Sequence, residues 1–125
     1  MESKAPGLFI EAVKKLREAN EELCKPEEDV VSYLVCKNSQ YAIENFMIGY
    51  LLSNNLELTG NENINTLYKK CVAIDEKFRE IDLKDFSCKG YRPDARSCSD
   101  TVKVSKCFEI ADKMDSFLRR EKVLQ

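Results

Sequence analysis

The middle of one long apolar segment carries polar side chains that could bind a ligand. Lys37, Gln40 and Glu44 follow one another at spacings of three and four, so in a helix they lie within about 60° of each other. Asn38 and Asn45 are predicted to project into the apolar side of this helix. A buried polar group without a partner costs about 1–3 kcal/mol. These residues therefore either form a hydrogen-bonded network that fixes the helix register or line a wet groove that receives a ligand.

A second group of polar residues lies in residues 87–100, SCKGYRPDARSCSD, the longest irregular stretch of the sequence. Tyr91, Arg92, Asp94 and Arg96 place two guanidinium groups beside an aromatic ring, an arrangement that suits a phosphate or a stacked base. In the alternative interpretation, the two arginines pair with Asp94 and neighbouring acids and only hold the loop in place.

The sequence contains no histidine, which limits the available catalytic mechanisms. Ser-His and Cys-His nucleophile pairs are excluded, and the commonest general base is absent. The 4 glycines are isolated, so there is no glycine-rich phosphate loop. The 6 cysteines include no CxxC pair and are expected to be buried thiols, with only Cys88 and Cys98 considered for redox chemistry. We predict no catalytic residues, no metal ligands and no cofactor.

The polar residues are positioned by the segment Val30–Leu52, which is predicted to be the central helix of the fold. Its apolar residues surround the helix nearly completely, so little of its surface suits water. A helix of this length would be about 35 Å long, enough to run through a small domain. Tyr33, Met47 and Leu51 are expected to remain exposed as an apolar patch on a monomer, which favours self-association.

Three further segments have the apolar spacing of amphipathic helices that cover the central one. The first is Gly7–Leu23. The second is capped at its start by Asn61 or Asn63 and runs to Ile81, and the last starts near Asp100 or Thr101. Pro26 and the acids after it are predicted to start the central helix, and Asp82 to cap a short turn that holds Leu83 and Phe86. The expected fold is all-α, an up-and-down bundle of four main helices plus a short helical turn, in one domain over residues 1–125.

Composition limits the kind of partner that the protein can have. Hydrophobic residues make up 43% of the 125 residues and charged residues 34%, as in a compact helical domain. The formal net charge of -2 provides no basic field to gather nucleic acid. Cysteines without a leader sequence indicate reduced thiols and a cytoplasmic location. No membrane span is expected, because the central segment is polar at its middle.

Three parts of the chain resemble the HEPN domain family. The central segment carries Gln40-Tyr41-Ala42-Ile43-Glu44 and then Gly49-Tyr50-Leu51, similar to the family's Gln-x-Ala-x-Glu core followed by a small residue and an aromatic or apolar pair. The third helix opens with Asn65-Thr66-Leu67, where the family has a His-x-Leu-type start. The last loop carries Tyr91-Arg92-Pro93-Asp94, similar to the family's Arg-Tyr-Pro-Asp segment with its first two residues exchanged.

The resemblance implies a dimeric helical bundle that is involved with RNA or nucleotides. Many family members are metal-independent ribonucleases that use an arginine and a nearby histidine, and several are toxins that act beside a nucleotidyltransferase partner. This sequence cannot carry that ribonuclease motif, because it has no histidine. Ile48 stands where the family usually has lysine, so only Gln40 and Glu44 carry over as matching positions.

These observations lead to one expectation with two alternatives. We expect a HEPN-like homodimer, not an enzyme, that binds a nucleotide, an RNA or a nucleotidyltransferase-type protein. The first alternative is a helical scaffold for interactions, without a small-molecule or nucleic-acid ligand. The second is a ribonuclease with a site that lacks histidine. The predicted ligand-binding residues are Lys37, Gln40, Glu44, Tyr91, Arg92, Asp94 and Arg96.

Overall fold

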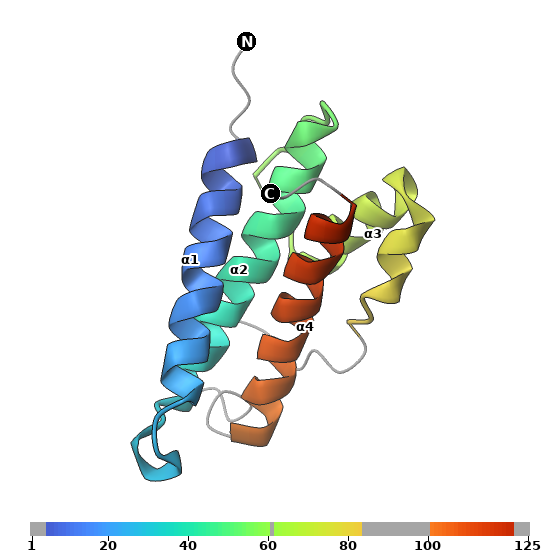
Figure 1. Cartoon of the computed structure of the whole chain (residues 1–125). Coiled ribbons are helices and arrows are strands. Elements are labelled where there is room, and N and C mark those ends of the chain that lie inside the picture. Colours follow the sequence, from blue (N-terminus) through green and yellow to red (C-terminus); the bar gives the residue numbers. More distant parts are fainter. Residues whose placement is uncertain (1–4, 61, 84–100, 122–125) are drawn as a thin grey trace.

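The computed structural model describes residues 5–60, 62–83 and 101–121. Every regular element in these ranges is helical, and they contain no strand. The elements are α1 (Ala5–Leu23), η1 (Glu27–Asp29), α2 (Ser32–Ser53), α3 (Ile64–Ile74), η2 (Glu76–Glu80) and α4 (Thr101–Arg120), as Figure 1 shows. The prediction of an all-α bundle with four main helices is confirmed.

The central position predicted for the long apolar helix is confirmed. α2 contacts α1, α3 and α4, and its length of 22 residues makes it the longest helix in the described ranges. In Figure 1, α1 is antiparallel to α2, whereas α4 runs in the same direction as α2. The shorter α3 and η2 lie at an angle beside these three helices. The main core therefore forms around α2, with Ala42, Phe46 and Met47 completely buried.

The start of α2 differs from the prediction, because Pro26 precedes only the short 3-10 turn η1. Val31, the residue before α2, is extended, with φ -91° and ψ 94°, and its side chain provides no cap. Instead, Glu22 at the end of α1 accepts a hydrogen bond from the Val31 backbone N–H at 2.9 Å. Its other carboxylate oxygen accepts one from Lys25 at 3.0 Å. A carboxylate at the end of α1 thus accepts a hydrogen bond from a backbone N–H group at the amino end of α2.

The third predicted helix ends earlier than expected. Of the two possible caps, Asn63 lies at the helix start, where its side-chain oxygen accepts a hydrogen bond from the Thr66 backbone N–H at 2.8 Å. α3 then ends at Ile74 instead of continuing to Ile81, because Asp75 is extended and its carboxylate caps η2. The turn predicted after Asp82 runs beyond position 83, outside the described residues.

The break after α3 turns the Phe78 side chain into the core, where it is completely buried. Its ring centroid lies 5.3 Å from that of Tyr50 in α2 and 5.2 Å from that of Phe117 in α4. Tyr68 of α3 packs edge-on against it at 6.0 Å. Phe78 therefore joins η2 to three helices through aromatic contacts.

Close packing between α1 and α2 depends on the absence of a side chain at Gly49. A Cβ atom at this position would lie 2.7 Å from the Phe9 ring, which is too short for a van der Waals contact. Gly49 itself is buried within α2. It forms a notch that receives the ring of Phe9 and lets the two helices approach closely.

The prediction that an exposed apolar patch drives self-association is wrong. Met47 and Leu51 are completely buried, and both belong to the core cluster that includes Leu67 and Cys71 of α3. Tyr33 is only half-buried, but it lies near the other end of α2. The short α3 covers the side of α2 that was expected to remain open. Among the described residues, no helix has the length and apolar character needed to cross a membrane.

Candidate functional site

One side of α2 is left partly open by the other helices, and the predicted polar residues lie there. At 100° per residue, eight half-buried or exposed positions fall within about 120° of each other around the helix. We call this surface the open stripe: Leu34, Lys37, Asn38, Tyr41, Glu44, Asn45, Ile48 and Leu52. The prediction that Asn38 and Asn45 project into the apolar side is therefore wrong. The remaining sides of α2 pack into the core and are mainly apolar. The polar side chains of α2 therefore lie mostly on the side where packing is incomplete.

The centre of the open stripe is an aromatic ring with two amines near it. The Lys37 ammonium lies 6.0 Å from the centroid of the Tyr41 ring, and the Lys15 ammonium of α1 lies 5.9 Å from it. Lys15 also pairs with Glu18 at 3.3 Å. These distances are at the outer limit for a cation–π contact, so each contributes about 0.5–1 kcal/mol at most. Sequence analysis did not select Lys15 or Tyr41 as site residues, because no pattern along the chain joins α1 to α2.

Gln40 is separated from its two predicted companions. Its side chain is 2% exposed, and its amide nitrogen donates to the sulfur of Cys36 at 3.1 Å. Cys36 is itself buried and packs with Cys107 of α4. Gln40 lies at an angle around the helix close to that of Lys37, but neighbouring side chains cover the Gln40 side chain. The structure thus brings Lys37 and Glu44 to the open stripe and places Gln40 inside.

Next to Gln40 lies a hydroxyl group that is fully buried. Ser39 is 0% exposed, and among the described residues its side-chain oxygen has no hydrogen-bond partner. A helix surrounded by apolar side chains tolerates such a group only at a cost, since the hydroxyl loses its contact with water.

The other predicted site residues lie outside the described part of the chain. These residues are Tyr91, Arg92, Asp94 and Arg96. The two cysteines considered for redox chemistry, Cys88 and Cys98, lie there as well. The described candidate site therefore consists of the open stripe and its neighbour Lys15.

Burial favours the neutral forms of one thiol and two tyrosine hydroxyls. Burial raises the pKa of the Cys71 thiol to about 12, and its sulfur lies 3.9 Å from the Met47 carbonyl oxygen. Burial also raises the pKa of the Tyr50 and Tyr68 hydroxyls. A thiol with such a pKa is a poor nucleophile at neutral pH. Within the described ranges, no cluster of three or more histidine, cysteine or acidic residues is suited to a metal ion.

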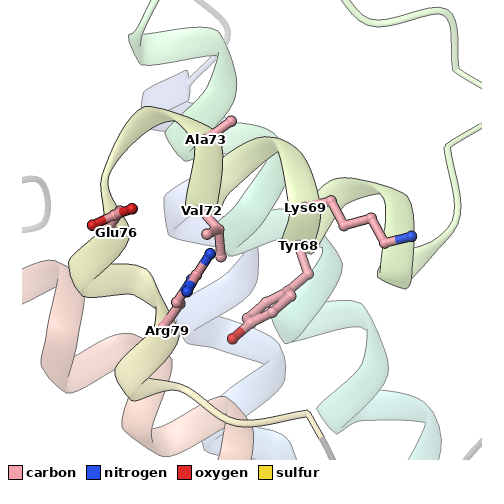
Figure 2. A pocket seen from close by; sticks show the side chains of 6 residues that line it. All are labelled: Tyr68, Lys69, Val72, Ala73, Glu76 and Arg79. Carbon is pink, nitrogen blue, oxygen red and sulfur yellow. The ribbon is translucent and has the colours of Figure 1, made fainter.

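The surface of the described helices includes two hollows of different size. The larger, the α3–η2 pocket, has a volume of about 670 Å³ and is drawn in Figure 2. Its lining residues are Tyr68, Lys69, Val72, Ala73, Glu76 and Arg79. Sequence analysis missed this pocket, since it treated α3 and η2 as one uninterrupted helix. On such a helix nothing distinguishes Arg79 from other surface residues.

The second hollow lies between α1 and α4 and has a volume of about 350 Å³. Arg17 and Asn20 of α1 face Asp112, Asp115 and Arg119 of α4 across it. The Arg119 guanidinium is held by both carboxylate oxygens of Asp115 at 3.1 Å. The two arginines and two aspartates that line this hollow carry no net formal charge, so it does not favour a charged ligand.

Comparisons with known proteins do not assign the chain to a family. No protein-family model matches it, and no curated protein or solved structure shows a significant similarity to it.

Proposed function

We propose that this protein is a non-catalytic, HEPN-like binding module that forms a homodimer through the open stripe of α2. The all-α bundle and the polar middle of its central helix support this proposal. The patch first expected to mediate the contact is buried, so the proposed interface uses other residues. They are the half-buried or exposed side chains on the adjoining side of the same helix.

The observation that carries the proposal is the complementarity of the open stripe with itself. Leu34, Tyr41 and Ile48 recur every seven residues, the spacing at which one helix packs along another. Lys37 lies four residues before Tyr41, and Glu44 lies three residues after it. When two copies pair antiparallel about a two-fold axis near Tyr41, Lys37 of each copy comes close to Glu44 of the other. Parallel pairing would instead place like charges together.

The charge of this surface favours a second protein copy over a nucleic acid. The open stripe carries one lysine and one glutamate, and the adjacent Lys15 is already paired with Glu18. Binding to nucleic acid depends on an excess of basic groups that neutralise phosphates. A contact restricted to one side of a helix is small for a stable interface, so we expect a dissociation constant of about micromolar size.

A charge-exchange experiment tests the proposed dimer. Lys37→Glu should place two acids against each other and weaken association by about tenfold or more, because like charges at an interface cost several kcal/mol. Glu44→Lys should have a similar effect. The double variant Lys37→Glu/Glu44→Lys should restore the dimer, since it exchanges the two partners of each pair. Sedimentation velocity over a range of protein concentrations gives the dissociation constants.

Lys113→Glu is the matched control, because this exposed residue lies on α4, away from the open stripe. It should leave the dissociation constant unchanged, and circular dichroism should show that all variants are folded. A wild-type protein that stays monomeric at hundreds of micromolar would refute the dimer. Association that the single substitutions leave intact would refute this interface.

A nucleotide, an RNA or a nucleotidyltransferase-type protein remains part of the proposal as the ligand of the module. The observation that favours an RNA is that Lys15 and Lys37 both lie near the Tyr41 ring, because a base could stack on the ring while the amines contact phosphates. Titration with a short single-stranded RNA should then show salt-sensitive binding that Tyr41→Ser removes. Binding that is equal in the wild type and in this variant would exclude the open stripe as the RNA site.

A further inference from the structure

The α3–η2 pocket has the chemical composition of a ligand site, although it lies away from the open stripe. Its volume of about 670 Å³ is within the range of pockets that hold small molecules. It exists because α3 stops at Ile74 and the chain turns into η2. An uninterrupted helix would have carried Arg79 further along the same axis, whereas the break brings it back beside Tyr68 and Val72, as Figure 2 shows.

Two positively charged side chains, Lys69 and Arg79, line this pocket together with one carboxylate, that of Glu76. Within the described residues, neither Lys69 nor Arg79 forms an ion pair. The other basic residue of η2, Lys77, does pair, with Glu121 at 3.6 Å. Arg119 and Arg120 of α4 are likewise paired with acids. An unpaired guanidinium at the edge of a hollow is suited to take an anion from solution.

One part of the pocket lining is aromatic and apolar. Tyr68 and Val72 are half-buried, and Ala73 completes this side. The Tyr68 ring is held in place by its edge-on contact with the buried Phe78. A ring that is fixed by the core offers a flat surface for stacking at little cost in side-chain entropy.

From these features, we infer that the α3–η2 pocket binds a small organic phosphate that carries a flat ring. Arg79 pairs with the phosphate oxygens, Lys69 adds a second positive charge at the rim, and the ring of the ligand rests on Tyr68 and Val72. Glu76 lies on the other side of Arg79 from Tyr68 in Figure 2. Its carboxylate disfavours a second anionic group at that end and can accept a hydrogen bond from a hydroxyl or amino group. With two cations and one acid, the lining favours a ligand with one phosphate.

Binding measurements with four probes test this inference. Isothermal titration calorimetry would compare adenosine monophosphate, phenyl phosphate, inorganic phosphate and adenosine. The two organic phosphates should bind with dissociation constants below about a millimolar, and the other two probes at least about tenfold more weakly, since each lacks one half of the interaction. Inorganic phosphate that binds as well as the organic phosphates would overturn the role of the Tyr68 surface. Adenosine that binds as well would overturn the role of Arg79.

Variants of η2 provide a matched comparison. Arg79→Gln should weaken binding of phenyl phosphate by about tenfold or more, because it removes the guanidinium partner of the phosphate. Lys77→Gln removes one positive charge from the same short helix, outside the pocket, and should change the affinity by less than about twofold. Equal effects of the two substitutions would refute the site. Neither residue lies on the open stripe, so a monomeric protein would leave this result unaffected.

Discussion

The inward side of α2 and its open stripe belong to one helix, but different requirements select their residues. Ala42, Phe46 and Met47 on the inward side are completely buried and apolar. The open stripe alternates apolar residues with lysine, glutamate and asparagine. Volume and shape determine which side chains fit in the core, whereas charge and spacing determine which side chains fit against a partner. α2 thus stabilises the fold with its inward side, and the open stripe is the side that we propose for recognition.

Truncation of a large side chain on the inward side should have the largest effect on stability. Phe46→Ala removes a completely buried ring from the middle of α2 and leaves a cavity. We expect the free energy of unfolding to fall by about 3–5 kcal/mol. Chemical denaturation followed by circular dichroism measures this change. Ile10→Ala is the control, because Ile10 is 71% exposed, and it should cost less than about 0.5 kcal/mol. Equal costs would contradict the assignment of Phe46 to the core.

A smaller, pH-dependent effect is expected at the amino end of α2. Hydrogen bonds from the Val31 backbone and from Lys25 lower the pKa of the Glu22 carboxyl below its ordinary value of 4.5. A carboxyl group with a lowered pKa stabilises the folded state above pH 4.5, and this contribution is lost as the pH falls through the lower, folded-state value. Glu22→Gln should therefore cost about 1–2 kcal/mol at pH 7, and less at pH 3.

The neighbouring residue supplies the control for this prediction. Glu21 is exposed, and it carries the same carboxyl group one position earlier. Glu21→Gln should leave the free energy of unfolding nearly unchanged at both pH values. A cost of Glu22→Gln that is the same at pH 3 and pH 7 would show that packing, and not the ionised carboxylate, connects α1 to α2.

The smallest effect on stability is expected on the open stripe. Tyr41→Ser removes a half-buried ring and its two cation–π contacts, and should lower the free energy of unfolding by about 1 kcal/mol. The same substitution should weaken dimer formation by about tenfold or more, because Tyr41 lies at the proposed two-fold axis. Denaturation and sedimentation velocity on one preparation separate the two effects. A loss of stability as large as that of Phe46→Ala would place Tyr41 with the core and remove the distinction between the two sides.

Local sequence patterns predicted much of the fold. The nearly complete apolar circumference of residues 30–52 indicated a central helix, and the Asn63 side chain was one of two predicted caps for the next helix. The start of α2 could not be read in this way, since its stabilising carboxylate comes from Glu22, nine residues before Val31. The end of α3 was missed because the apolar spacing continues through Phe78 although the backbone changes direction at Asp75.

The candidate site was less accessible to sequence reasoning than the fold. The angle around a helix groups Lys37, Gln40 and Glu44, but it does not reveal which side the other helices will cover. Burial next to Cys36 removed Gln40 from the surface. Similarly, the angle alone gave no reason to place Met47 and Leu51 inside. Tertiary packing decides these cases, and a single sequence does not specify it residue by residue.

The notch at Gly49 also limits how the bundle can change shape. The Phe9 ring occupies the one place on this part of α2 where no side chain projects. One helical turn away in either direction the ring would meet Asn45 or Ser53, each of which has a side chain. α1 therefore cannot slide along α2 by one turn without expelling the ring. A tilt or a rotation of α1 about this contact would leave the Phe9 ring in the notch, whereas a one-turn slide would not.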